Sequence, residues 1–313
     1  MFDTSSTTEY PPASEGYLGI RKSVRTIWKA RTGIIFTVPA IILILVFLAY
    51  PLISGLNLSL YRWNGIGEPT YVGIENFQRL LADPEFLIVL KNSFLFTLIT
   101  AFGEIILGFF LAVAIERRVR GWGIYKIVFF LPVIIPRVIT GSIWTRLFDP
   151  LIGPINPALE SLGITAPYWL SDNNWALIGV ALVAIWQYSG FPMLVLLAAM
   201  ENIPLEVHEA ATLDGVNGWQ RMQKIIFPLI LPTIAVLLML QLIAGLKAFD
   251  LIWVMTQGGP GNATKLLGVS LYEKAFEAQA LGYASAWAVV LAAIVMSFSL
   301  LYQHYLRPDS VEY

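Results

Sequence analysis

The sequence predicts an all-α membrane protein with six transmembrane helices and with both termini in the cytoplasm. Of its 313 residues, 57% are hydrophobic and only 13% are charged, and its mean hydropathy is +0.69. An ordinary soluble protein has roughly 45–50% apolar and about 25% charged residues. This composition excludes a soluble globular protein, and the distribution of the remaining polar residues gives the topology.

Six apolar stretches are long enough to cross a bilayer, for which a helix needs about 20 residues. Each must be helical, because lipid cannot satisfy exposed backbone N–H and C=O groups. In chain order, the predicted spans are Gly33–Ile53, Ser93–Ile115, Ile124–Phe148, Ala176–Met200, Leu229–Val254 and Ala284–Leu306.

Lysine and arginine outside these stretches are concentrated on one side of the membrane. Eleven of them fall in the N-terminal tail, the loops after the second and fourth spans, and the C-terminus, with Lys126 at the start of the third span as a twelfth, whereas five fall on the opposite side. The richer side is normally cytoplasmic. We therefore expect a cytoplasmic tail over 1–32, which carries no signal-peptide cleavage site, a transmembrane domain over 33–306 and a cytoplasmic tail over 307–313.

Several classes of chemistry are excluded by the residues themselves. The chain has no cysteine, two histidines and a net charge of −1, so we expect no disulfide framework, no metal centre and no nucleic-acid partner. His208 and Glu209 begin like a zinc-binding H-E-x-x-H motif, but Thr212 replaces the second histidine. The glycine-rich run at 258–265 lacks the G-K-[ST] of a phosphate-binding loop. We therefore expect no catalytic residue and no cofactor in this chain.

Prolines lie inside or at the ends of several predicted spans. Two interpretations remain open for each of them: a kink that neighbouring helices support, or a pivot about which a helix moves during transport. These residues are Pro39, Pro51, Pro132, Pro136, Pro192, Pro228 and Pro232.

The cytoplasmic loop at 201–227, between the fourth and fifth spans, is patterned as a helix–turn–helix. Pro204–Leu213 predicts a short helix that begins with a proline, and Gly215 supplies a stop in the left-handed conformation. Asn217 and Gln220 have the spacing of a capping box for a second short helix. We expect this second helix to run through Phe227 and to be ended by Pro228 and Pro232. Ala210 and Ala211 offer a small-residue surface to another protein.

This loop resembles the EAA loop of permease subunits of binding-protein-dependent ABC importers. The family pattern, E-A-A-x3-G-x9-I-x-L-P, matches Glu209-Ala210-Ala211, Gly215 and Ile225-Ile226-Phe227-Pro228, with Phe227 in place of the usual leucine. Three further stretches are similar to the carbohydrate branch of that family, the maltose and glycerol-phosphate importers. They are Tyr71–Phe77, Phe249-Asp250 with Met255–Gly261, and Gly282–Ala286.

The resemblance implies a type I ABC importer permease fold in the cell inner membrane. It implies that a coupling helix seats in a cytoplasmic ATPase subunit, with the contact made by Glu209, Ala210, Ala211, Leu213, Asp214 and Gly215. The implied partners are a second related permease, two ATP-binding subunits that hold ATP and Mg, and an extracytoplasmic solute-binding protein. The alternative is a surface helix–turn–helix that only joins two spans.

Polar residues inside the spans are candidates for the solute pathway, because burying them in a membrane is costly. Lys247 and Asp250 are also spaced to pair with each other on one helical face, which is the structural alternative. The candidates for the pathway are Glu104, Gln187, Tyr188, Gln241, Lys247 and Asp250, with Arg137 a further buried charge. The rival function is an ion-coupled secondary transporter, in which Glu104 and Asp250 bind the ion.

Two segments on the opposite side of the membrane are candidates for docking the solute-binding protein. The turn at Gly258–Gly261 either touches that partner or only reverses the chain. The polar loop from Asp149 to Trp175 has no lysine or arginine. We interpret Trp144 and Trp253 as anchors at this outer interface.

Overall fold

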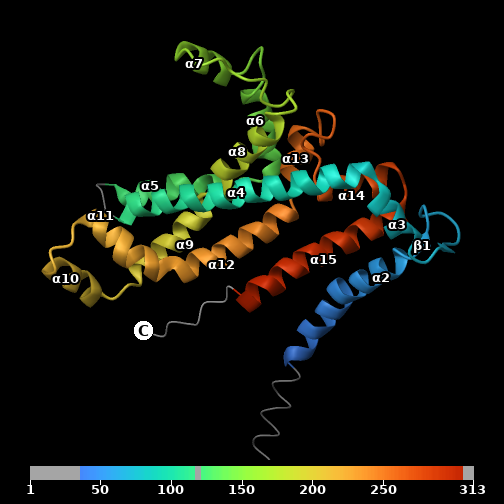
Figure 1. The fold of residues 1–313 in the computed structure, drawn as a ribbon, viewed down its shortest axis with the longest axis horizontal. Helices are drawn as coiled ribbons and strands as arrows, with labels where there is room; N and C mark the ends of the chain where they lie inside the picture. Colours follow the sequence, from blue (N-terminus) through green and yellow to red (C-terminus); the bar gives the residue numbers. More distant parts are fainter. Residues whose placement is uncertain (1–35, 117–120, 306–313) are drawn as a thin grey trace, which may run out of the picture. The chain divides into compact units, whose positions relative to one another are not determined.

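The computed structural model describes residues 36–116 and 121–305 (Figure 1). By internal contacts the chain divides after Gly55. Phe36–Leu58 forms one apolar helix of 23 residues. Within it, the π-helical segment η1 (Leu45–Ala49) directly precedes α2 (Tyr50–Leu58), which carries Pro51 in its first turn. A π-helical turn shifts the backbone hydrogen bonds where a proline offers no N–H.

The described chain from Leu56 onward is mainly helical, as the sequence predicts. Three single helices in it are long and apolar enough to span a membrane: α4 (Pro84–Glu116), the run Gly218–Leu246, and Leu281–Tyr302 within α15 (Leu281–Tyr305). With Phe36–Leu58 this gives four candidate spans among the described residues, and up to six if each of two bent helix pairs is one span.

The two bent pairs coincide with the third and fourth predicted spans. The first pair joins α5 (Trp122–Phe130) and the 3₁₀ helix η2 (Leu131–Ile134) to α6 (Arg137–Leu147), with a bend of 98°. Pro136 is the N-cap residue of α6 and lies at this bend. The second pair, α8 (Ala176–Tyr188) and α9 (Gly190–Glu201), bends by 42° shortly before Pro192.

The prediction that Pro228 and Pro232 end the second helix of the loop at 201–227 is wrong. α11 (Gly218–Arg221), the π-helical η3 (Met222–Ile226) and α12 (Phe227–Leu246) form one continuous helix. Pro228 lies in the first turn after η3, where the N–H of Phe227 bonds to the carbonyl of Met222. The π-helical turn accommodates Pro228, so the helix continues past it.

The predicted end of the fifth span is also wrong. α12 ends at Leu246, Lys247 caps it, and Phe249 leaves the helical region with φ −144° before α13 (Asp250–Met255) begins. The residues beyond the break remain apolar because Ala248, Leu251 and Ile252 are buried in protein. Hydropathy therefore could not distinguish a buried turn from a continuing span.

The long helix α4 is the central element of packing, and α8, α9 and α12 all contact it. One buried cluster, which includes Ile105, Met193, Leu196 and Ile230, joins α4 to α9 and α12. A second cluster, around Phe96 and Val180, joins α4 to α8, α13 and α14 (Leu267–Tyr272). Figure 1 shows α4 and α12 running beside each other.

Near the N-terminal end of α4, short elements close the structure. The strands β1 (Tyr61–Arg62) and β2 (Thr70–Tyr71) pair antiparallel and lead into α3 (Glu75–Ala82). The amide of Asn76, in the first of the carbohydrate-branch stretches, donates to the carbonyls of Ser59 and Tyr61 at 2.8 and 2.9 Å. A Cβ on Gly282 would lie 1.9 Å from the Tyr61 carbonyl oxygen, so the start of α15 needs glycine there.

An ion network fixes the same end of the molecule. Glu85 at the start of α4 bonds to Lys274 in η4 (Glu273–Glu277) at 2.9 Å, and Lys265 bonds to Glu273 at 2.8 Å. At the other end of α4, Glu116 pairs with Arg221 of α11 at 3.6 Å. The two ends of a 33-residue helix are about 50 Å apart. The loop at 201–227 therefore lies about a membrane's thickness away from the ion network.

Candidate functional site

The predicted coupling helix is present as α10 (Leu205–Leu213), with Pro204 as its N-cap residue. Its C-terminus is closed by a pair of backbone hydrogen bonds, from Val216 to the Ala211 carbonyl and from Gly215 to the Thr212 carbonyl, both 3.1 Å. This is the Schellman arrangement, and Gly215 has the positive φ of 70° that it requires. The helix is therefore held rigidly at the end that carries the motif.

Five of the six predicted coupling residues lie on the surface of α10 and its cap. Glu209, Ala210, Leu213, Asp214 and Gly215 are exposed. Ala211 is instead buried within the chain, with 3% of its surface accessible. The small-residue surface therefore consists of Ala210 alone, and Ala211 belongs to the internal packing of the loop.

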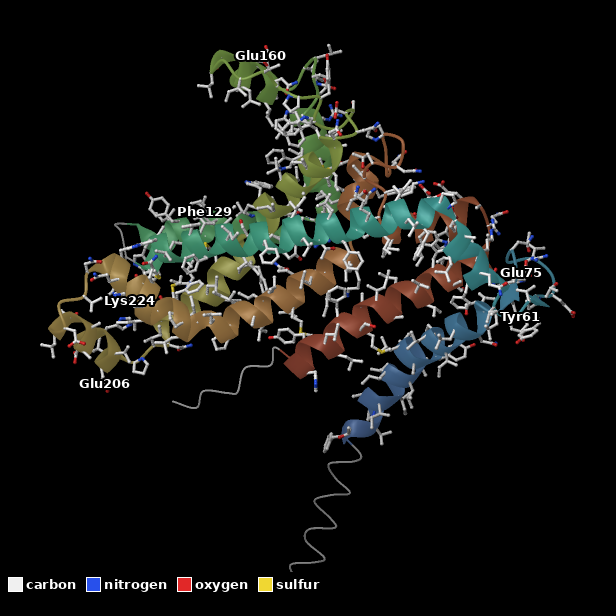
Figure 2. All side chains as sticks on the ribbon, viewed as in Figure 1. Tyr61, Glu75, Phe129, Glu160, Glu206 and Lys224 are labelled. Carbon is white, nitrogen blue, oxygen red and sulfur yellow. The ribbon has the colours of Figure 1, made fainter. Side chains whose placement is uncertain are left out.

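The surface of this loop also carries large apolar side chains. Leu213 is 89% exposed, Leu205 is 68% exposed and Trp219 is 62% exposed. Figure 2 shows α10, with Glu206 labelled, at the opposite end of the helices from Glu75. Trp219 was not among the residues predicted to make this contact, although a tryptophan in such a loop is a signal of a contact surface.

A second predicted feature, the capping box, connects the loop to the membrane helix. The Asn217 side chain accepts from the backbone N–H of Gln220 at 2.9 Å, and the Gln220 side chain accepts from that of Asn217 at 3.1 Å. From this cap the helix runs unbroken to Leu246 and carries Gln241 near its far end. One continuous helix therefore links the loop at the surface to a polar residue in the interior.

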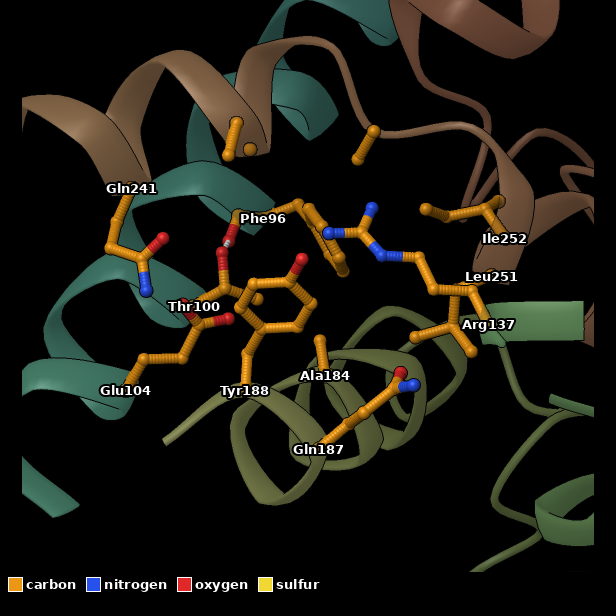
Figure 3. Close-up of a pocket in the computed structure, with 13 residues that line it drawn as sticks. Phe96, Thr100, Glu104, Arg137, Ala184, Gln187, Tyr188, Gln241, Leu251 and Ile252 are labelled. Carbon is orange, nitrogen blue, oxygen red and sulfur yellow. Dashed lines mark hydrogen bonds between the residues drawn. The ribbon is translucent and has the colours of Figure 1, made fainter. Parts of the chain in front are cut away.

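Four of the six candidate pathway residues meet in one cavity (Figure 3). Glu104 comes from α4, Gln187 and Tyr188 come from the end of α8, and Gln241 comes from α12. Arg137, from the start of α6, lines the same cavity. The bends in the two helix pairs bring these residues together, because Arg137 and Tyr188 each lie directly at a bend.

The polar side chains of the cavity differ in whether they have partners. The amide of Gln187 donates to the carbonyl of Ile135 at 2.8 Å and to the hydroxyl of Thr140 at 2.9 Å. These bonds tie α8 to the bend before α6. The guanidinium of Arg137 lies 4.9 Å from the centroid of the Tyr188 ring, a cation–π distance. The hydrogen bonds of Gln187 therefore stabilise the bend.

Gln241 and Glu104 lack such partners. The Gln241 side-chain nitrogen is buried without a hydrogen-bond partner, and the residue is 5% exposed. Glu104 is 7% exposed and forms no ion pair or hydrogen bond within the described part of the chain. The positive charge of Arg137 lies in the same cavity. Figure 3 shows both side chains directed toward Thr100 and the Tyr188 ring. These two groups are free to bind a polar molecule.

The cavity has a volume of about 30 Å³. A buried water needs at least about 10–15 Å³, so this space holds one or two waters but no sugar ring. A sugar ring would fit only if helices that line the cavity, such as α4, α8 and α12, moved apart.

Lys247 and Asp250 do not line this cavity. Both are exposed, and the break after Leu246 separates them onto different elements. Within the described residues neither has an ion-pair partner, so the pairing of Lys247 with Asp250 on one helical face is wrong. Lys247 instead lines a separate apolar groove between α12 and α15.

The glycine-rich turn is anchored from within. The Thr264 hydroxyl donates to the Gly259 carbonyl at 2.7 Å and lies 2.7 Å from the Thr256 hydroxyl, while Asn92 of α4 donates to the Asn262 carbonyl at 2.8 Å. The turn therefore has a structural role whether or not it also contacts a partner. The polar loop after α6 carries the short helix α7 (Ile155–Ser161).

Known proteins share this sequence and fold. The family model described as binding-protein-dependent transport system inner membrane component matches residues 104–307. A probable ABC transporter permease of Pyrococcus horikoshii is 34% identical, covering 87% of this chain and 95% of that protein. The probable starch degradation products transport permease AmyD of Thermoanaerobacterium thermosulfurigenes is 32% identical, with coverages of 89% and 94%.

A solved structure is also similar to this chain in sequence and in fold. A chain of a bacterial alginate ABC transporter, in complex with an alginate pentasaccharide-bound periplasmic protein, superposes with a TM-score of 0.78 and 25% identity. The match covers 91% of this chain and 96% of that chain. Both the sequence and the arrangement of helices are therefore shared over nearly the whole length.

Proposed function

Since the chain belongs to the inner-membrane permease components of binding-protein-dependent ABC transport systems, in the carbohydrate-uptake branch, we propose that it carries a sugar or related polyol into the cytoplasm as one subunit of an ATP-driven importer. ATP and Mg are held by two separate ATP-binding subunits. A second related permease completes the pathway, and an extracytoplasmic solute-binding protein delivers the solute. This chain performs no covalent chemistry.

The topology in this proposal has six spans, each bent pair counting as one, and both termini in the cytoplasm. It rests on the excess of lysine and arginine on the side that holds α10. The ion network around Glu85 then faces outward. A solute enters near the N-terminal end of α4 and leaves near Glu116.

One observation carries the proposal: the exposed, capped helix α10 is connected by a continuous helix to the cavity. When ATP draws two ATP-binding subunits together, a displacement of α10 passes through the Asn217 capping box into the helix Gly218–Leu246. That helix carries Gln241, so the displacement reaches the cavity wall. A rigid helix transmits such a movement, whereas a flexible linker would absorb it.

In the proposed pathway, Gln241, Glu104 and Tyr188 contact the solute once the cavity opens. An amide and a carboxylate bond to hydroxyl groups, and an aromatic ring covers the apolar face of a sugar. The names of two similar proteins, a permease for starch degradation products and an alginate transporter, support a carbohydrate as the solute. Lys247 and Asp250 remain candidates for a contact outside this cavity.

ATP-driven uptake in proteoliposomes tests the coupling role of α10. The complex is purified with its native subunits, and radiolabelled maltose, trehalose and glycerol phosphate serve as probes. We expect Glu209→Lys and Gly215→Pro to abolish uptake while leaving the amount of inserted chain unchanged, because both alter the surface or shape of α10. Glu277→Lys, an equal charge change at an exposed site near the other end of α4, should leave uptake intact.

Two results would contradict the proposal. One is full ATP-driven uptake by both α10 variants. The other is uptake that follows an ion gradient and ignores ATP, which would favour the secondary transporter.

A further inference from the structure

An apolar groove between α12 and α15 is separate from the polar cavity. It consists of two adjoining hollows that share Ile243, with volumes of about 490 and 340 Å³. The first hollow reaches Lys247 and the second reaches Tyr302. On α15 the groove extends from Ala288 to Tyr302, about 21 Å at 1.5 Å per residue.

Among the described residues that line the groove, Lys247 is the one that carries a charge. It is exposed at the end of α12, and it has no ion-pair or hydrogen-bond partner in the described part of the chain. An ammonium group next to hydrocarbon is costly unless an anion or water reaches it. The other lining residues that the structure describes, which include Leu291, Val295 and Met296, offer no anion.

We propose that the groove binds an anionic phospholipid, with its phosphate on Lys247 and one acyl chain between α12 and α15. The hydrocarbon of one leaflet is about 15 Å deep, half of the about 30 Å of a bilayer core, and an acyl chain of that length fits within the groove. Ala288 and Ala292 leave room for it, because their side chains are small. Basic residues between transmembrane helices bind lipid head groups in this way.

Charge distinguishes this occupant from another apolar helix. The helix Phe36–Leu58 contains no aspartate or glutamate, so it has no side chain that neutralises Lys247. A phospholipid supplies both parts of the complement, an apolar chain for the groove and a phosphate for the ammonium group. The proposal goes beyond the transport function and does not depend on how α10 is coupled.

The test measures lipid bound to the full chain, purified with its co-purifying subunits, by native mass spectrometry. The probes are phosphatidylglycerol and phosphatidylcholine with identical acyl chains. We expect the wild type to prefer phosphatidylglycerol and Lys247→Met to weaken its binding about fivefold, the effect of one basic residue near a lipid surface. Lys247→Arg should restore binding. Lys91→Met, which removes an exposed lysine on α4 outside the groove, is the matched control.

A second measurement identifies the occupant directly. The chain has no cysteine, so Met296→Cys takes a single photoactivatable label in the groove. We expect this label to react with phospholipid, and Ala292→Trp, which fills the groove, to reduce that reaction. Equal binding of the two lipids, unchanged binding in Lys247→Met, or reaction of the label with the Phe36–Leu58 helix or another subunit would each overturn the proposal.

Discussion

At the scale of single residues, two buried glutamines in one cavity have different roles. The side-chain amide of Gln187 donates to the backbone carbonyl of Ile135 and to the hydroxyl of Thr140, whereas the amide nitrogen of Gln241 has no hydrogen-bond partner. A sequence cannot separate these cases, because both are glutamines in apolar spans. Only the bend at Pro136, which turns the Ile135 carbonyl toward α8, makes Gln187 structural.

Matched substitutions at these two positions test the assignment. We expect Gln187→Leu to destabilise the protein by about 1–3 kcal/mol, because it leaves buried polar groups unpaired, and therefore to lower the melting temperature in detergent. Gln241→Leu removes an amide that has no partner, so the melting temperature should stay unchanged or rise while sugar uptake falls. The reverse pattern, with Gln241→Leu the less stable variant, would refute this assignment.

At the scale of elements, the unbroken helix from Gly218 to Leu246 is the one proposed to transmit the displacement of α10 to the cavity. Val236 and Leu240 are each 47% exposed on α12 between the loop and Gln241, so they can be changed without opening the core. Replacing both with glycine softens the helix by about 1 kcal/mol per position relative to alanine. We expect uptake per ATP hydrolysed to fall severalfold in this double variant.

The matched control places two glycines at exposed sites of another membrane helix. Ala293→Gly with Ser297→Gly has the same spacing on α15, which does not connect to the loop. Its ratio of uptake to ATP hydrolysis should equal that of the wild type. Equal ratios in both double variants would show that the stiffness of α12 plays no part in coupling.

The sequence predicts elements well where one physical signal dominates. Hydropathy locates α4 and α15, and the chemistry of Gly215 and of Asn217 with Gln220 locates the caps of the cytoplasmic loop. It fails where tertiary contacts replace lipid or water. The break after Leu246 is apolar on both sides, and Pro228 is absorbed by the π-helical turn Met222–Ile226.

At the scale of the whole molecule, the sequence predicts the class of protein but not how its distant parts meet. The excess of apolar residues indicates a membrane protein, and the pattern from Glu209 to Pro228 indicates its family. The cavity depends on two bends, of 98° and 42°, whose size no local pattern gives. For this reason four candidate pathway residues meet there, while Lys247, an equally plausible polar residue by sequence, faces the groove between α12 and α15.

In the proposed importer, α10 contacts an ATP-binding subunit at the cytoplasmic face. Because the chain has no cysteine, one photoactivatable cross-linker can be attached at Leu213→Cys on α10, and one at Leu81→Cys on α3 as the control. Both positions are highly exposed, at 89% and 71%, and they lie near opposite ends of α4. In the purified complex we predict a cross-link from position 213 to an ATP-binding subunit and none from position 81. A cross-link from position 81, or none from position 213, would contradict the account.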